Sequence, residues 1–174
     1  MTVGTAPGES MEEKRALLRH FLAALAYRTQ KALRDAPETF AAFRAGPQVR
    51  TPHELVGHMN SVLGYATTFF VGGAYRVPPQ PTFAAEIERF HATLEELGRL
   101  VDAASDWSAI SPEQLLQGPL SDAMTHAGQL ALLRRLAGDP VPPENFVFAD
   151  VDPANLGPRQ APPARPDEDW PERP

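Results

Sequence analysis

The chain has 174 residues, of which 19 are proline and none is cysteine, and 16 basic against 22 acidic side chains give it a formal charge of −6. This length predicts one globular domain, and the lack of cysteine excludes disulfides, thiolate metal ligands and a cysteine nucleophile. The acidic balance speaks against nucleic acid as the main partner. No apolar run is long enough for a membrane span, and the N-terminus lacks the basic start and apolar run of a signal peptide. We therefore expect a cytoplasmic protein that binds neither nucleic acid nor a membrane.

Four segments carry apolar residues three or four positions apart, which is the spacing of amphipathic helices. The predicted helices span residues 10–34, 52–70, 83–103 and 119–137, with a short helix near 112–116. Capping boxes predict three of the helix starts, at Ser10 with Glu13, Thr51 with Glu54 and Ser111 with Gln114. A further start is expected at Thr82, and Gly138 is expected to end the last helix.

Proline is concentrated at the C-terminal end, where ten of the 19 lie in the last 35 residues. Because proline lacks a backbone N–H and clashes with the preceding helical turn, helices must end before Pro140. We expect a helical domain over 9–138 and an extended arm over 139–174 that is not a separate domain. The first half of this arm is apolar enough to lie against the core.

Polar residues share the inward faces of two predicted helices. His58 lies in a series of apolar residues spaced three or four apart, so it is expected to point inward. Asp122 and His126 are four apart on another helix, so they lie about 40° apart on one face. An aspartate near a buried face is costly unless it is paired or coordinates a metal.

Two imidazoles and one carboxylate on facing helices would form a three-ligand metal site at His58, Asp122 and His126. This donor set suits Zn²⁺, Fe²⁺ or Ni²⁺ and leaves a position open for water or substrate. The alternative is an internal cluster in which Asp122 pairs with His126 and no metal is bound.

Five other side chains are candidates for a smaller role. His53 is expected to cover the start of its helix, while His20 and His91 are expected at the surface or its boundary. Tyr65 is expected in the core or at the edge of a cavity. Gln129 either orients a metal ligand or ties its helix to the arm.

The segments TPHELVGHMNSVLGY (51–65) and SDAMTHAGQLALLRRLAGDPVPPENF (121–146) resemble the DinB/YfiT-like superfamily of metal-binding helical bundles. The helical spacing and the proline distribution predict an all-α bundle of four main helices followed by the proline-rich arm, and the resemblance implies an up-down-down-up order for the four-helix bundle. Members carry one histidine in the second helix, matched by His58, and a His-x-x-x-His pair before Gly-Gln in the fourth, whose second histidine matches His126. Asp122 stands where many members have histidine, although some thiol-dependent isomerases of the superfamily have glutamate there.

The function that this resemblance implies is a metal-dependent enzyme acting on a small-molecule substrate. The leading interpretation is a transferase that uses a low-molecular-weight thiol of the bacillithiol or mycothiol type, with zinc, or else nickel or iron, activating the thiol. One alternative is a hydrolase that uses water activated by the metal. Another is a non-catalytic stress-response module for binding or dimerisation. The resemblance also implies a homodimer.

Overall fold

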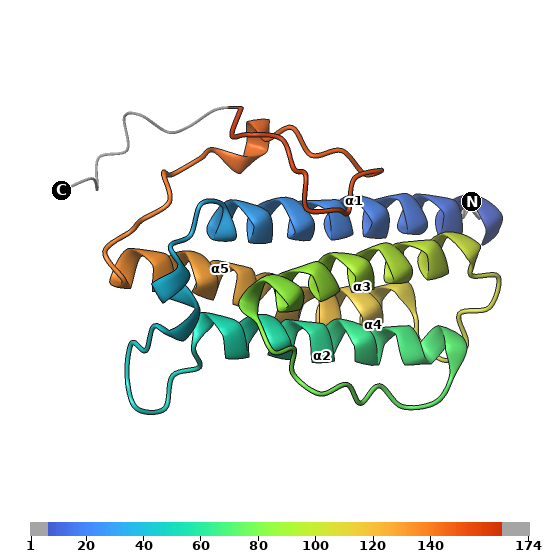
Figure 1. The fold of residues 1–174 in the computed structure, drawn as a ribbon. Coiled ribbons are helices and arrows are strands. Elements are labelled where there is room, and N and C mark those ends of the chain that lie inside the picture. The colour runs from blue at the N-terminus through green and yellow to red at the C-terminus, as the bar shows by residue number, and fades with distance from the viewer. Residues whose placement is uncertain (1–6, 165–174) are drawn as a thin grey trace.

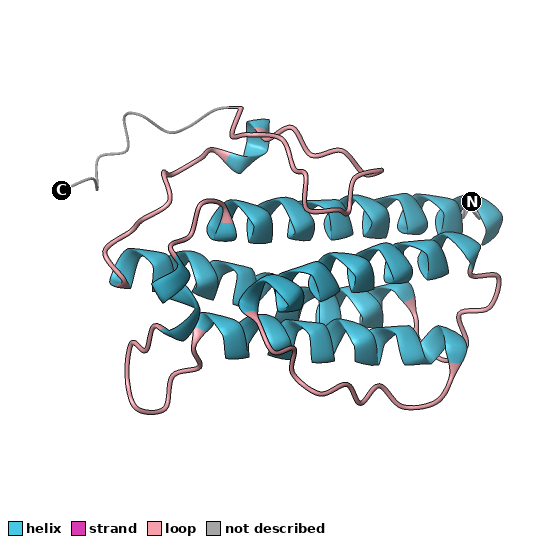
Figure 2. Cartoon of the chain, in the orientation of Figure 1, coloured by secondary structure: helices cyan, strands magenta, loops and turns pink. Residues whose placement is uncertain are grey.

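The computed structural model describes residues 7–164, and over this range the chain is helical, with no strand (Figures 1 and 2). Four long helices account for most of it, and shorter helical turns lie between them and after them. None of the helices in the described range combines the length and the apolar character that crossing a membrane requires. In chain order the elements are α1 (Pro7–Leu33), the 3₁₀ turn η1 (Glu38–Ala42), α2 (Pro52–Val71), α3 (Phe83–Ala103), α4 (Pro112–Leu115), the π-helical turn η2 (Leu116–Leu120), α5 (Ser121–Leu136) and the 3₁₀ turn η3 (Phe146–Phe148).

Local capping explains where three of these helices begin. The Thr51 hydroxyl accepts from the backbone N–H of Glu54, whose carboxylate accepts from the Thr51 N–H, so the predicted capping box is confirmed. Ser111 and Gln114 form the same reciprocal pair at the start of α4. Thr82 caps α3 through a single hydroxyl contact. These side chains satisfy N–H groups that have no partner inside a helix.

Two predicted helix starts are wrong. The first helix begins at Pro7, which places Ser10 inside α1 rather than at its N-cap. A proline in the first turn costs no hydrogen bond, so the chain can become helical one turn earlier than the Ser10 box predicts. The last helix begins at Ser121 instead of 119, because the π-helical turn with Pro119 comes before it. Gly138 ends this helix with a positive φ of 81°, as predicted.

The four long helices lie side by side and enclose one apolar core (Figure 1). Helix α1 packs on α3 and α5, and α2 packs on the same two helices from the other side. Completely buried side chains from all four helices fill the space between them, and several are large. Among these are Leu22 and Tyr27 of α1, Met59 and Leu63 of α2, Phe90 and Leu94 of α3, and Leu130 of α5. Pairing of α2 with α5 is the contact that positions the site described below.

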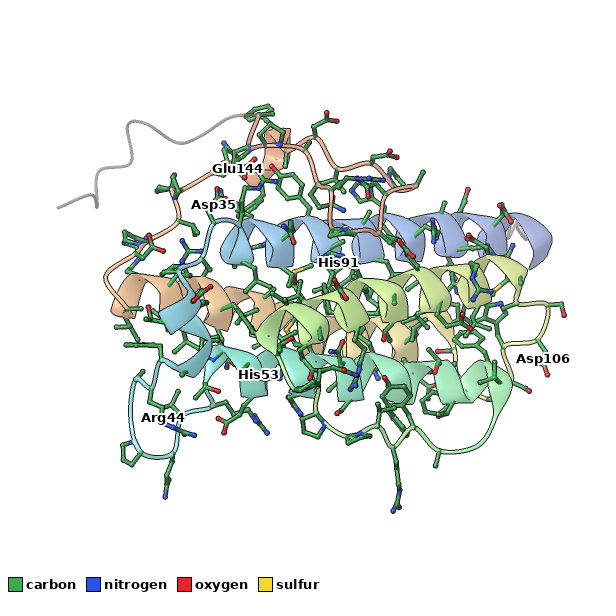
Figure 3. The ribbon with its side chains drawn as sticks, viewed as in Figure 1. Asp35, Arg44, His53, His91, Asp106 and Glu144 are labelled. Atoms are coloured by element: carbon green, nitrogen blue, oxygen red, sulfur yellow. The ribbon has the colours of Figure 1, made fainter. Side chains whose placement is uncertain are left out.

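Residues 139–164 cross the outer side of α1 (Figure 1). Glu144 anchors this segment, because its buried carboxylate accepts from the Tyr27 hydroxyl at 2.5 Å and from the Lys31 ammonium at 2.8 Å. Further along, the Leu156 side chain is buried and its carbonyl oxygen lies 2.8 Å from Nδ1 of His91. Figure 3 labels Glu144 in this segment and His91 on α3. Glu144 and Leu156 therefore hold this segment against the helices, whereas its apolar residues Val147 and Phe148 are largely exposed.

His91 corrects a prediction. The sequence predicts it at the surface or its boundary, but only 2% of it is exposed. The reason is the returning C-terminal segment, which covers that side of α3 and supplies the carbonyl that its ring requires.

Candidate metal centre

The structure brings together the three side chains that the sequence singled out. His58 comes from α2, and Asp122 and His126 come from consecutive turns of α5. One ligand atom from each residue lies within 4.8 Å of the other two. The i,i+4 spacing places Asp122 beside His126, and the packing of α2 on α5 adds His58.

His126 is the most enclosed of the three, with 9% of its side chain exposed. Its Nδ1 lies 2.8 Å from the Gln129 amide oxygen. An amide oxygen only accepts hydrogen bonds, so this contact assigns the ring proton to Nδ1 and leaves a lone pair on Nε2. The buried Nε2 atom has no hydrogen-bond partner. It is 3.3 Å from Asp122 Oδ1, another acceptor, and such a pair is stable only with a proton or a cation between them.

His58 faces His126 directly. The two ring centroids are 4.8 Å apart, and the ring planes are inclined by 72°. Burial lowers the pKa of His58, repulsion by Arg50 and by His126 lowers it further, and Asp122 acts in the opposite direction. His58 is therefore neutral near pH 7, which is the state in which imidazole binds a metal.

Asp122 closes the set on the solvent side, with 48% of its side chain exposed. It also lines a groove between α2 and α5. A cation held by these three groups would thus have two imidazoles on its protein side and an accessible position toward the groove. An open position of this kind distinguishes catalytic metal sites from closed structural ones.

The donor set fits a divalent metal. Zinc ligands stand 2.0–2.2 Å from the ion, so two tetrahedral ligands lie about 3.4 Å apart. The Asp122–His126 pair already has this separation, at 3.3 Å. Ligand atoms as far apart as 4.8 Å must approach by about 1.4 Å, which small rotations of the exposed Asp122 and half-buried His58 side chains can supply.

The π-helical turn before α5 shapes the edge of the centre. Gly118 has φ −89° and ψ −105°, outside helical values, and Pro119 follows it inside the turn. The Ser121 hydroxyl donates to the Leu116 carbonyl at 2.7 Å and so binds the two ends of the turn together. Turns of this type often occur at functional sites, and here the turn leads directly into Asp122.

His53 and Tyr65 lie outside the three-residue set. The Nε2 atom of His53, labelled in Figure 3, is 3.8 Å from the carboxylate of Glu86. This carboxylate is fully buried and accepts hydrogen bonds from the Asn60 side chain and from the Gln80 N–H. His53 thus faces α3 as well as covering its helix start. Tyr65 is 57% exposed, so the expectation of a core tyrosine is wrong, and it lines the groove beside Asp122.

Sequence reasoning missed the Glu86 cluster and the residues of the groove. Glu86 follows the Thr82 cap by four positions and gives no sign in the sequence that it is buried. The Gly118-Pro119 pair was the available signal for an irregular turn, because both residues disrupt an α-helix. His20, by contrast, is exposed as predicted. No protein-family model, curated protein or solved structure matches this chain.

Proposed function

We propose that the protein is a metal-dependent transferase that uses a low-molecular-weight thiol, with His58, Asp122 and His126 as the metal ligands. The observation that carries the proposal is the buried, unpartnered Nε2 of His126 facing Asp122 Oδ1 at 3.3 Å, with His58 beside them. Two acceptors and a neutral imidazole make a ligand set that is incomplete without a cation.

A divalent ion held there would supply the electrostatic stabilisation that lowers the pKa of a bound thiol or water toward neutrality. Gln129 keeps the His126 proton on Nδ1, so that Nε2 is free for the metal. Asp122 contributes the negative charge and leaves the groove side open. The chain has no cysteine, so a thiol nucleophile must come from a cosubstrate.

We further propose that α1, α2, α3 and α5 form the up-down-down-up bundle of the DinB/YfiT-like superfamily, with residues 139–174 as its arm. The cyclic packing of the four helices and the position of the site between the second and the last of them support this. Homodimer formation and a cytoplasmic location stay predictions from the sequence.

The first experiment is elemental analysis of protein purified without a polyhistidine tag. We expect about one equivalent of zinc, nickel or iron, in line with a single three-ligand site, and its loss in Asp122→Ala and His126→Ala. His20→Ala is the matched control, because His20 is exposed on α1 and takes no part in the set. Protein that holds no metal after dialysis against each ion would favour the non-catalytic binding module.

The second experiment separates the transferase from the hydrolase. Cobalt-loaded protein is titrated with bacillithiol and, separately, with its S-methyl derivative. A sulfur-to-cobalt charge-transfer band that appears only with the free thiol supports the transferase. A cobalt site that gives no such band, in a protein that hydrolyses a panel of aryl esters in a His126-dependent way, would identify the hydrolase instead.

A further inference from the structure

A groove between α2 and α5 borders the candidate metal centre. Ser61, Val62 and Tyr65 form its α2 side, and residues 117–119 of the π-helical turn with Ser121, Asp122 and Thr125 form the other. Its volume is about 680 Å³. Pockets of a few hundred to a thousand cubic ångströms are the size that holds a small organic ligand.

The lining of this groove includes no basic side chain. The protons of its serine and threonine hydroxyls are also committed: Ser61 donates to the Gly57 carbonyl, Ser121 to that of Leu116, and Thr125 to that of Ser121. These hydroxyl oxygens therefore face the groove as hydrogen-bond acceptors, alongside the Asp122 carboxylate. Such a wall repels an anion and favours a ligand that donates hydrogen bonds.

Three side chains give the groove an apolar, partly aromatic surface. Tyr65 stands at its edge and packs edge-on against Phe69, with ring centroids 4.9 Å apart. Val62 and Pro119 provide aliphatic surface from the two sides. A ring that stacks on the exposed face of Tyr65 would bury apolar area on both partners.

The opposite side of the centre has a different character. His58 borders a second depression of about 470 Å³ that is also lined by Glu54, Glu86 and Arg89. His58 lines this depression and Asp122 lines the groove, so the candidate metal ligands stand between the two spaces. Of the two spaces, only this depression offers a cationic side chain, Arg89, to an anionic cosubstrate.

We propose that the groove beside Asp122 binds the substrate of this centre, and that this substrate is an uncharged molecule with an aromatic ring. The inference rests on the proposed metal centre. Asp122 and one cosubstrate thiolate would together balance the two positive charges of a divalent ion, so a neutral ring then suits the groove better than a charged one. The substrate's reactive group lies at the metal, and its ring lies on Tyr65.

Three hydroxamic acids test this with metal-loaded protein, because they share one metal-binding head. Acetohydroxamic acid has no ring, benzohydroxamic acid adds a neutral ring, and 4-carboxybenzohydroxamic acid adds an anionic one. Binding is measured by calorimetry. We expect benzohydroxamic acid to bind about tenfold more tightly than acetohydroxamic acid. We expect 4-carboxybenzohydroxamic acid to bind no more tightly than acetohydroxamic acid.

Two variants and one control assign the difference in affinity to the groove. Tyr65→Ala is expected to abolish the gain from the neutral ring and to leave the affinity for acetohydroxamic acid unchanged. The exposed Phe148 provides the control variant Phe148→Ala, which should change neither. Thr125→Lys, which adds a cation to the groove wall, should make the carboxylated ring the tighter ligand.

Equal affinities for the ringed and ringless acids, or a preference for the anionic ring in the unaltered protein, would overturn the proposal while the metal centre stands. If the protein takes up no metal on loading and binds none of the three acids, the metal centre is refuted, and the groove proposal with it.

Discussion

The amide oxygen of Gln129 lies 2.8 Å from Nδ1 of His126. His126 precedes Gln129 by about one helical turn on α5. Since the amide oxygen can only accept, this contact fixes the ring tautomer and turns Nε2 toward Asp122. Partners of this kind change metal affinity by 10- to 100-fold in other proteins. We therefore expect Gln129→Leu to weaken zinc binding by about 10- to 100-fold, measured by competition with a chromogenic chelator.

Gln129 is exposed, so its replacement should leave the thermal unfolding of metal-free protein unchanged. Gln48→Leu makes the same chemical change at an exposed position in the loop before α2 and should not alter zinc affinity. Gln129→Glu keeps an acceptor and should retain binding. If Gln129→Leu binds zinc as tightly as the unaltered protein, Gln129 does not position His126.

A metal held by His58 and His126 would link α2 to α5 across the site. Binding to the folded state alone stabilises it, by about 2.7 kcal/mol when free metal is at 100 times its dissociation constant. We expect zinc to raise the midpoint of urea unfolding accordingly. Asp122→Asn should remove most of the increase. An equal increase in Asp122→Asn would show that zinc binds elsewhere.

The buried pair of Lys31 and Glu144 holds residues 139–164 on α1. The Glu144 side chain is fully buried, so removing its ammonium partner leaves an uncompensated charge, at a cost of about 3–5 kcal/mol. We expect Lys31→Met to lower the free energy of unfolding by that amount and to increase proteolysis within this segment.

Lys14→Met is the matched substitution, because Lys14 pairs with Glu113 at 2.6 Å on the exposed surface. Exposed pairs contribute about 0–1 kcal/mol, so this variant should be close to neutral. If Lys31→Met and Lys14→Met lower the free energy of unfolding by similar amounts, burial of the Lys31–Glu144 pair does not account for its contribution to stability.

His91 is expected to make stability depend on pH. Burial lowers the pKa of His91, only partly offset by its hydrogen bond to the Leu156 carbonyl and by the charge of Glu95. In the unfolded chain its pKa returns to about 6.5, so below that pH the unfolded state binds more protons. The contribution of His91 to stability is therefore complete above about pH 7 and is lost as the pH falls through 6.5 toward its folded pKa.

His91→Asn keeps a side-chain N–H for the Leu156 carbonyl but cannot titrate. We expect the fall in unfolding free energy between pH 7.5 and 5.5 to be smaller in this variant, as measured by urea denaturation. His20→Asn, at an exposed position, should follow the unaltered protein. A pH profile unaffected by His91→Asn would assign the dependence to other groups.

The features that could be predicted from the sequence are those determined by residues close together along the chain. The Thr51 and Ser111 caps involve residues three positions apart, and both predictions are confirmed. Asp122 and His126 meet by helix geometry alone. The place of His58 beside them depends on which helices pack together, which spacing alone does not state. Burial of His91 depends on Leu156, from a distant segment that has no periodic pattern.

The π-helical turn at 116–120 also bears on how this chain can vary in length. A π-helical turn contains one residue more than an α-helical turn, so the chain has one extra residue shortly before Asp122. Packing of Leu130 and Ala127 in the core determines which face of α5 points inward. Loss or gain of a residue at Gly118 would therefore change the turn and the floor of the groove, while Asp122 and His126 kept their direction. Insertion or deletion at this point would thus reshape the groove and leave the cluster of His58, Asp122 and His126 in place.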